Sequence, residues 1–159
     1  MKDFTVTLDE TENPAALKFA SVFNIAVPFI DRHLDAGRAG KVAILTEDSE
    51  VTYGALAEGV NRCGNALKSL GVLPGERALM VVKDCPEFLY AFFGAIKAGI
   101  IPVPVNTILR AADYRYLIED SGAAVLIHSP EFAGVVAEAL AAADHKPAHA
   151  LDTEALVAQ

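Results

Sequence analysis

The stretch from Cys85 to Asn106 constrains the fold of this chain more than any other segment. Pro86 suits the first turn of a helix, where its missing N–H leaves no hydrogen-bond partner unmet. Apolar residues then recur at helical spacing, namely Phe88, Leu89, Phe92, Phe93 and Ile96. A helix that is apolar over most of its circumference is expected to be buried, and Gly99 is expected to end it in the left-handed conformation.

A short apolar run from Ile100 to Val105 follows this helix and predicts a buried strand. Pro102 and Pro104 cannot donate hydrogen bonds to a neighbouring strand, so we expect the strand to lie at a sheet edge or to contain a bulge. A helix, a glycine and an apolar strand in this order predict half of a right-handed parallel crossover unit.

The rest of the chain alternates between strand and helix patterns. The expected elements are a helix at 25–34, a hairpin of strands 42–45 and 51–53, a helix after Thr52 that ends at Gly71, a strand at 78–82, a helix at 111–120, a strand at 124–127, a helix at 131–143 and a short strand after His145. This order predicts the α/β class, with a mostly parallel sheet covered by helices on both faces and preceded by a short β-hairpin. Residues 1–22 are polar and mixed, which predicts a loosely attached N-terminal arm before one α/β domain at 23–159.

Charge and composition exclude several classes of function. The net charge of −8 argues against nucleic acid as a partner, because a phosphate backbone requires a basic surface. The apolar runs are too short to span a membrane, and the acidic start is not a signal peptide. Two cysteines form neither a disulfide framework nor a metal site. We therefore expect a cytoplasmic protein without a metal site. Its 53% hydrophobic content also fits a domain that hides one face against another body or self-associates.

No common catalytic motif is present, so any chemistry of this chain must rest on individual residues. His128 ends an apolar strand, where ligands bind in open α/β sheets, although local hydrogen bonding is the commoner role. Asp84 and Glu87 flank the start of the central helix, where its dipole favours acids. Cys63 lies within an apolar helix stripe, so a buried structural role is favoured over a reactive thiol. His145 and His149 lack neighbouring Cys or acidic ligands, which favours a solvated loop over a metal site.

Arg110 is the unusual residue of the chain, because it is expected at the N-cap of the 111–120 helix. Ser, Thr, Asp or Asn are the residues that usually cap a helix there. Asp113, one turn further on, is expected to offset the unfavourable interaction of the cation with the helix dipole. Arg110 is therefore either an ordinary surface arginine or a phosphate contact, since a guanidinium and free helix N–H groups together suit an anion.

Several segments together resemble the beginning of the AMP-forming acyl- and aryl-CoA synthetases, which belong to the adenylate-forming superfamily. The segments are FNIA at 23–26, VTYGAL at 51–56, NALKSLGVLPGERALMVVKDCPEF at 65–88, FFGAIKAGIIPVPVNTIL at 92–109 and ADYRYLIEDSGAAVLI at 112–127. The FN start and the PVPVNT-x-L-x-A-D-Y pattern are most similar to the benzoate- and hydroxybenzoate-CoA ligases. The resemblance runs from about Phe23 to Ala143.

This resemblance implies an enzyme that activates a carboxylic acid with ATP and magnesium to an acyl-adenylate, and then transfers the acyl group to coenzyme A. It also implies that the phosphate loop and the other catalytic motifs lie beyond the matched region, so no catalytic residue is expected in this chain. Some members have an arginine in the Asn-x-x-Leu turn that contacts the phosphates of coenzyme A. Ile108 occupies that position here, and Arg110 stands two residues later.

Two hypotheses follow from the sequence. In the first, the chain is the N-terminal subdomain of an aryl-CoA ligase, inactive alone, with a scaffolding role and with the remaining part of the ligase large domain as its partner. A small aromatic acid would then be the substrate of the full enzyme. In the second, the chain is a free-standing, non-catalytic α/β domain that binds a protein partner.

Overall fold

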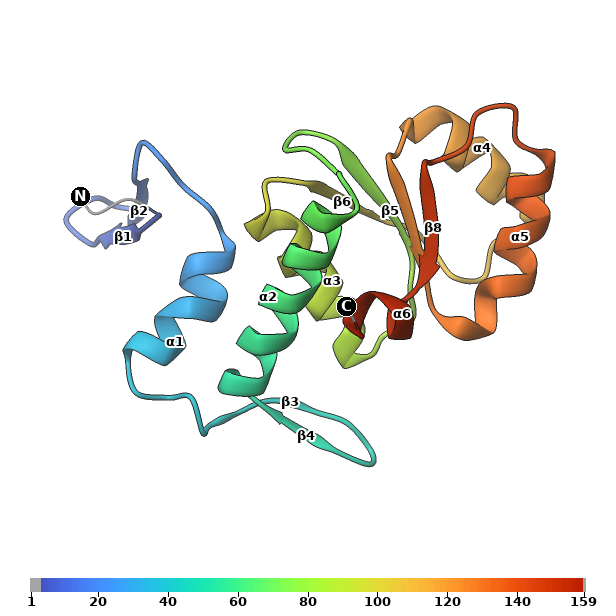
Figure 1. Cartoon of the computed structure of the whole chain (residues 1–159). Helices are drawn as coiled ribbons and strands as arrows, with labels where there is room; N and C mark the ends of the chain where they lie inside the picture. Colours follow the sequence, from blue (N-terminus) through green and yellow to red (C-terminus); the bar gives the residue numbers. More distant parts are fainter. Residues whose placement is uncertain (1–3, 159) are drawn as a thin grey trace. The chain divides into compact units, whose positions relative to one another are not determined.

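The computed structural model describes residues 4–158, which form two compact units, a first unit up to Ala57 and a second unit from Glu58 onward (Figure 1). Each unit contains elements of the predicted kinds. The α/β class, the parallel sheet and the short antiparallel hairpin of the prediction are all confirmed.

The first unit begins with a hairpin of two antiparallel strands, β1 (Val6–Asp9) and β2 (Ala16–Phe19). The sequence predicts no strands in this segment, because its apolar residues are sparse and interrupted by acids. A π-helical turn, η1 (Val27–Asp31), then runs into α1 (Arg32–Asp35), and Gly37 follows with a positive φ of 72°. The helix predicted at 25–34 is therefore present, although half of it has π geometry.

A second hairpin joins β3 (Val42–Leu45) and β4 (Glu50–Thr52) in the antiparallel sense, as predicted. The hydroxyl of Thr46 accepts a hydrogen bond from the N–H of Ser49 and so closes the turn. The next helix, α2 (Tyr53–Ser69), is capped as expected, because Thr52 Oγ1 accepts a hydrogen bond of 3.2 Å from the N–H of Ala55.

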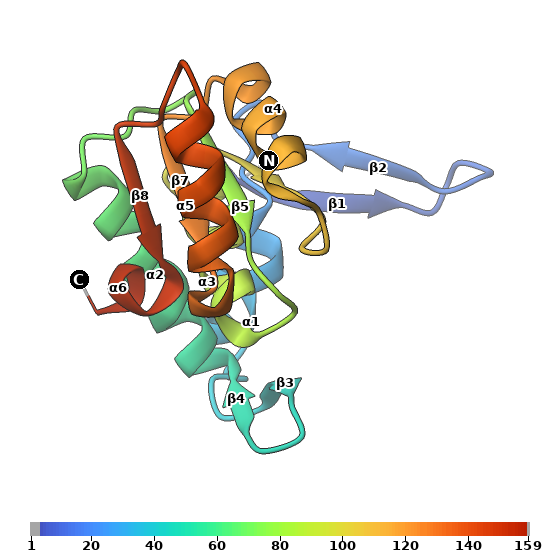
Figure 2. The ribbon, with the colours of Figure 1, turned by 90° about the vertical axis from the view of Figure 1, so that its right-hand side faces the viewer.

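The second unit is organised around four parallel strands in the order β6-β5-β7-β8. Figure 2 labels β5, β7 and β8 of this sheet. The strands are β5 (Arg77–Val81), β6 (Ile101–Pro104), β7 (Val125–His128) and β8 (His149–Asp152). Among residues 4–158, the proline-containing strand β6 pairs with β5 alone and so lies at an edge of the sheet. Proline is tolerated in an edge strand, because the backbone on one side of that strand donates no hydrogen bonds to a neighbouring strand.

Helices cover both faces of this sheet, and the alternation of side chains along each strand divides the core between them. On one face, Ala78 and Met80 of β5 pack with residues of α2, α3 (Pro86–Lys97) and α6 (Thr153–Val157). On the other face, Leu79 and Val81 pack with residues of α4 (Ala111–Ser121) and α5 (Ala133–Ala142). A short helical turn, η2 (Pro130–Phe132), leads into α5, and α6 was not predicted from the sequence.

The central helix α3 differs from the prediction in which of its side chains are buried. Its large apolar residues are only half-buried, whereas Ala91, Gly94 and Ala95 are fully buried. The reason is a close approach of α2 and α3, in which Gly64 and Gly94 face each other. Small residues let two helix backbones come together, so the smallest side chains of α3 occupy the core.

Candidate functional site

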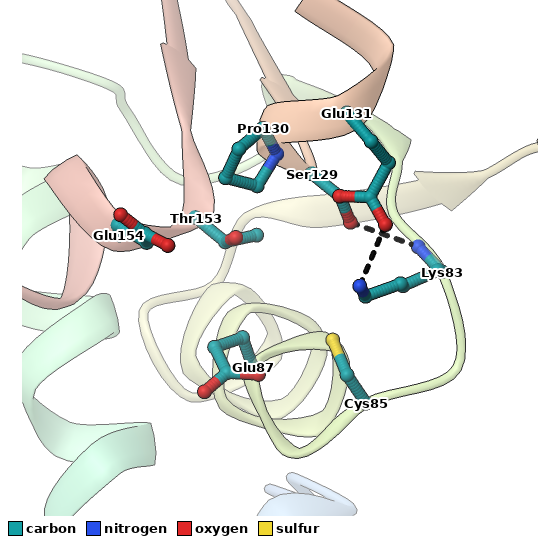
Figure 3. A pocket seen from close by; sticks show the side chains of 8 residues that line it. All are labelled: Lys83, Cys85, Glu87, Ser129, Pro130, Glu131, Thr153 and Glu154. Atoms are coloured by element: carbon teal, nitrogen blue, oxygen red, sulfur yellow. Dashed lines mark hydrogen bonds and ion pairs between the residues drawn. The ribbon is translucent and has the colours of Figure 1, made fainter.

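A cavity of about 470 Å³ lies at the carboxyl ends of β5, β7 and β8 (Figure 3). We call it the strand-end cavity, and it is lined by Lys83, Cys85, Glu87, Ser129, Pro130, Glu131, Thr153 and Glu154. In open α/β sheets, ligands bind outside the carboxyl ends of the strands, since the loops that leave the strands converge there. The strand-end cavity is therefore the candidate functional site of the second unit.

Ser129 ties the ends of two strands together beneath this cavity. Its backbone N–H donates a 3.0 Å hydrogen bond to the carbonyl of Val81, and its Oγ accepts a 3.1 Å hydrogen bond from the N–H of Lys83. Ser129 is almost completely buried, so both bonds are shielded from water. They fix the position at which the chain leaves β5 and approaches α3.

A salt bridge spans the cavity between the loop after β5 and the turn η2. Lys83 Nζ and Glu131 Oε1 are 2.6 Å apart, and both side chains are largely exposed. The hydrogen bond to Glu131 raises the pKa of Lys83, and the same bond lowers the pKa of Glu131. Lys83 is thus held charged and paired with a carboxylate. Figure 3 shows this ion pair as a dashed line.

The charges around the strand-end cavity do not fit a polyphosphate. Lys83 is the single cation among the lining residues, against the three carboxylates of Glu87, Glu131 and Glu154. Transfer of a phosphoryl or adenylyl group requires cations and oriented N–H groups at the developing negative charge. This lining does not fit the phosphates of ATP, and no step of such a reaction is assigned to it.

Cys85 lies at the N-cap of α3 beside the cavity and is half-buried. Burial raises the pKa of its thiol above the ordinary value, and the charge of Glu87 acts in the same direction. The thiolate is the nucleophilic form of cysteine. Cys85 is consequently not an activated nucleophile.

The structural roles favoured for Cys63 and His128 agree with the structure, whereas the loop expected at His149 does not. Cys63 is fully buried, and burial raises the pKa of its thiol to about 12. A ring nitrogen of His128 lies 2.9 Å from the carbonyl oxygen of Ser129, which is the local hydrogen bonding favoured for a strand-end histidine. Glu87 lies in the first turn of α3, and His149 begins β8 instead of lying in a loop.

The sequence did not single out Lys83, Ser129 or Thr153, because their chemistry depends on loops that are distant in the chain. The rule that ligands bind at strand ends is the signal that could have found them. Applied to every predicted strand, it would have pointed to the residues that follow β5, β7 and β8.

Arg110 occupies the N-cap of α4, as predicted, with extended backbone angles of φ −94° and ψ 165°. Its side chain is exposed, and its backbone N–H donates a 3.1 Å hydrogen bond to Asp113 Oδ2. The Asp113 carboxylate therefore lies in the first turn of α4, where it offsets the unfavourable interaction of the Arg110 cation with the helix dipole, as expected. Ile108 precedes it in the same loop and is 84% exposed. The loop follows the carboxyl end of β6, and so it lies at the same end of the parallel sheet as the strand-end cavity.

Two other kinds of site are absent from residues 4–158. These residues contain no group of three or more His, Cys, Asp or Glu side chains arranged to hold a metal ion. In this same part of the chain, no helix is long and apolar enough to cross a membrane.

Comparison with known proteins places these observations in a family context. The sequence profile of the AMP-binding enzymes matches residues 31–158. The chain is 45% identical over 123 residues to a 4-hydroxybenzoate-CoA/benzoate-CoA ligase of Rhodopseudomonas palustris. It is 42% identical over 124 residues to a benzoate-CoA ligase of Thauera aromatica. Each match covers 77% of this chain.

Solved structures show the same similarity in three dimensions. A benzoate-CoA ligase from Burkholderia xenovorans superposes with a TM-score of 0.76 at 37% identity, over 86% of this chain and 28% of that one. An anthranilate-CoA ligase in complex with anthranoyl-AMP superposes with a TM-score of 0.78 at 33% identity, over 86% of this chain and 27% of that one. The chain spans about a quarter of the length of the curated relatives, with 23% and 24% of the two ligases matched.

Proposed function

Because this chain belongs to the family of AMP-binding enzymes, we propose that it is the N-terminal part of an aryl-CoA ligase. The complete enzyme would activate a benzoate-like aromatic acid with ATP and magnesium to an acyl-adenylate and then transfer the acyl group to coenzyme A. The observation that carries this proposal is the 45% identity to a ligase named for benzoate and 4-hydroxybenzoate.

Within that enzyme, the role proposed for this chain is structural. Residues 23–159 would form the N-terminal α/β subdomain, preceded by an arm at 1–22. The acidic lining of the strand-end cavity supports this role, because it does not suit the phosphates of a nucleotide. The groups that bind ATP and magnesium would belong to the remaining part of the large domain, which is the proposed partner of this chain.

Arg110 is proposed to contact a phosphate of a ligand in the complete enzyme. Its exposed guanidinium stands at the N-terminus of the 11-residue helix α4, where the helix dipole also favours an anion. Coenzyme A is the phosphate-bearing substrate that a surface site of this kind suits. An Arg110→Gln variant of the complete enzyme should raise the KM for coenzyme A and leave the KM for benzoate unchanged. If the variant and the wild-type enzyme have the same KM for coenzyme A, this role of Arg110 is refuted.

Pyrophosphate exchange tests the proposed function directly. A protein that contains this chain and the remaining ligase sequence should exchange labelled pyrophosphate into ATP when benzoate is present, and acetate should not replace benzoate. The 159-residue chain alone should give no exchange above the blank. Benzoate-dependent exchange by the isolated chain would refute its scaffolding role, and no exchange by the complete protein with any aromatic acid would refute the ligase assignment.

A cytoplasmic location is also proposed, because Cys63 and Cys85 are free thiols and the cytosol keeps thiols reduced. The apolar side chains that the first unit exposes outside its cavity, including Leu8, Val22 and Leu45, support contact with another protein surface. That surface is either the remainder of the ligase or a second copy of this chain, and size-exclusion chromatography of the isolated chain distinguishes a monomer from a dimer.

A further inference from the structure

The first unit contains a cavity of about 540 Å³ that is distinct from the strand-end cavity. We call it the aromatic cavity, and it is lined by Val6, Leu17, Phe19, Phe23, Ile25, Pro28, Phe29, Arg32, His33 and Tyr53. These residues come from β1, β2, η1, α1, the intervening loop and the first residue of α2 (Figure 1). The volume lies within the range of about 300–1,000 Å³ that is usual for small-molecule sites.

The walls of the aromatic cavity are suited to a flat ring. Phe19 and Phe23 meet edge to face, with ring centroids 4.9 Å apart, and Phe29 is 56% exposed. On another side, Tyr53 stacks on His33 with centroids 3.9 Å apart and planes 12° from parallel. Aromatic side chains attract further rings in offset or edge-to-face contacts. In this cavity, the contact between Phe19 and Phe23 and the stack of Tyr53 on His33 already fix the orientation of these rings in part.

The polar groups of this cavity include a cation and a hydrogen-bond donor. Arg32 lines it, and His33 Nδ1 accepts a 3.1 Å hydrogen bond from Arg38 Nε. That bond leaves the ring proton of a neutral His33 on Nε2, which is then a donor. Burial lowers the pKa of His33, and the nearby charges of Arg38, Arg32 and Lys41 lower it further.

Arg32 is the one cation among the residues that line the aromatic cavity, in a chain whose net charge is −8. No Asp or Glu side chain is among the residues that line the aromatic cavity. The acids Asp31 and Asp35 lie on the same helical segment as Arg32, outside the lining. An apolar, ring-lined hollow with a cationic side is complementary to a ligand that joins an aromatic ring to an anion.

We propose that the aromatic cavity is a binding site for a small aromatic carboxylate, with the ring against Phe19 and Phe29 and the carboxylate against Arg32. A guanidinium binds a carboxylate through two parallel hydrogen bonds, and the His33 Nε2–H supplies a third donor. The proposal rests on the first unit alone, so it is independent of the ligase reaction. The site would hold an aromatic acid outside the groups that perform the chemistry.

The test is a titration of the 159-residue chain with sodium benzoate, followed by protein NMR. Benzoate should bind saturably, with a dissociation constant on the order of 1 mM for so small a ligand. The largest shifts should fall on Phe19, Phe29 and Tyr53. Benzyl alcohol, which keeps the ring, and acetate, which keeps the charge, should each bind at least fivefold more weakly.

Two matched variants identify the cation. Arg32→Leu keeps an apolar stem and removes the charge, so it should weaken benzoate binding at least fivefold. Lys68→Leu removes an exposed cation from α2 in the second unit and should leave binding unchanged. Circular dichroism of both variants would verify that they fold.

Three results would overturn the proposal. The first is the absence of saturable binding at benzoate concentrations tenfold above the expected constant. The second is an Arg32→Leu variant that binds benzoate as tightly as the wild type. The third is a dimer in which a second copy covers Phe19 and Phe29 and excludes benzoate, because the occupant of the cavity would then be protein.

Discussion

Gly94 is the position at which the packing of the second unit can be tested most directly. A Cβ atom placed on this glycine would lie 2.8 Å from the carbonyl oxygen of Val60 and 2.9 Å from the backbone nitrogen of Gly64. The shorter contact is about 0.6 Å closer than the 3.4 Å at which ordinary contacts begin. Both contacted atoms belong to the backbone of α2, which cannot rotate away as a side chain would. A Gly94→Ala substitution must therefore move α3 away from α2.

The expected cost follows from two opposing terms. Overpacking a well-packed core by one carbon costs about 1–3 kcal/mol, and the upper part of this range applies because backbone atoms are involved. Alanine favours the helix over glycine by about 1 kcal/mol. The net destabilisation expected for Gly94→Ala is about 1–2 kcal/mol, so the urea midpoint should fall by roughly 0.5–1 M.

Urea unfolding followed by circular dichroism at 222 nm measures this change, since the chain contains no tryptophan. Gly134→Ala in α5 is the matched control, because a Cβ there would meet no atom within 4 Å. The control should be as stable as the wild type or slightly more stable. A Gly94→Ala variant that equals or exceeds the wild type in stability would refute the close approach of α2 and α3.

Three further substitutions or treatments test single features of the second unit. Lys83→Met removes the hydrogen bond that lowers the pKa of Glu131, so that pKa should rise toward 4.5 in an NMR titration. In the wild type, the stabilisation from this pair should be lost as the pH falls through the lowered pKa of Glu131, or as it rises through the raised pKa of Lys83. Cys63, whose pKa is about 12, should resist iodoacetamide at pH 8 until urea unfolds the chain, and rapid labelling of the native state would contradict its burial. Tyr114→Phe removes a 2.9 Å hydrogen bond to the carbonyl of Asn106 and should cost about 1 kcal/mol in thermal unfolding, whereas an unchanged midpoint would show that the bond does not hold the loop before α4.

The elements of the second unit could be predicted because each carries a local signal. The stripe that contains Val60, Cys63 and Leu67 has the period of a helix, and Gly99 and Gly122 adopt the positive φ values that end helices. The prolines of β6 excluded a central position in the sheet before any partner strand was known. Hydrophobic periodicity and the backbone preferences of glycine and proline act between neighbouring residues of the chain, so they can be recognised from the sequence.

The hairpin of β1 and β2 and the short helix α6 escaped prediction for the opposite reason. β1 and β2 contain four residues each, and α6 contains five. Segments this short have weak patterns, and their stability comes from partners that they contact after folding. The cap that begins α6, in which Asp152 Oδ1 accepts a 2.7 Å hydrogen bond from the N–H of Ala155, is a local signal, but the helix that follows is too short to show a periodic pattern.

The sequence by itself determined the class of the fold and the likeness to aryl-CoA ligases, because both depend on the order and spacing of residues along the chain. Only the tertiary structure decided which small residues of α3 face α2, and which charges surround each cavity. Lys83 and Glu131 are 48 positions apart in the sequence, yet their charged atoms lie 2.6 Å apart at the end of the sheet. Such distances result from the parallel pairing of distant strands, and no local pattern encodes them.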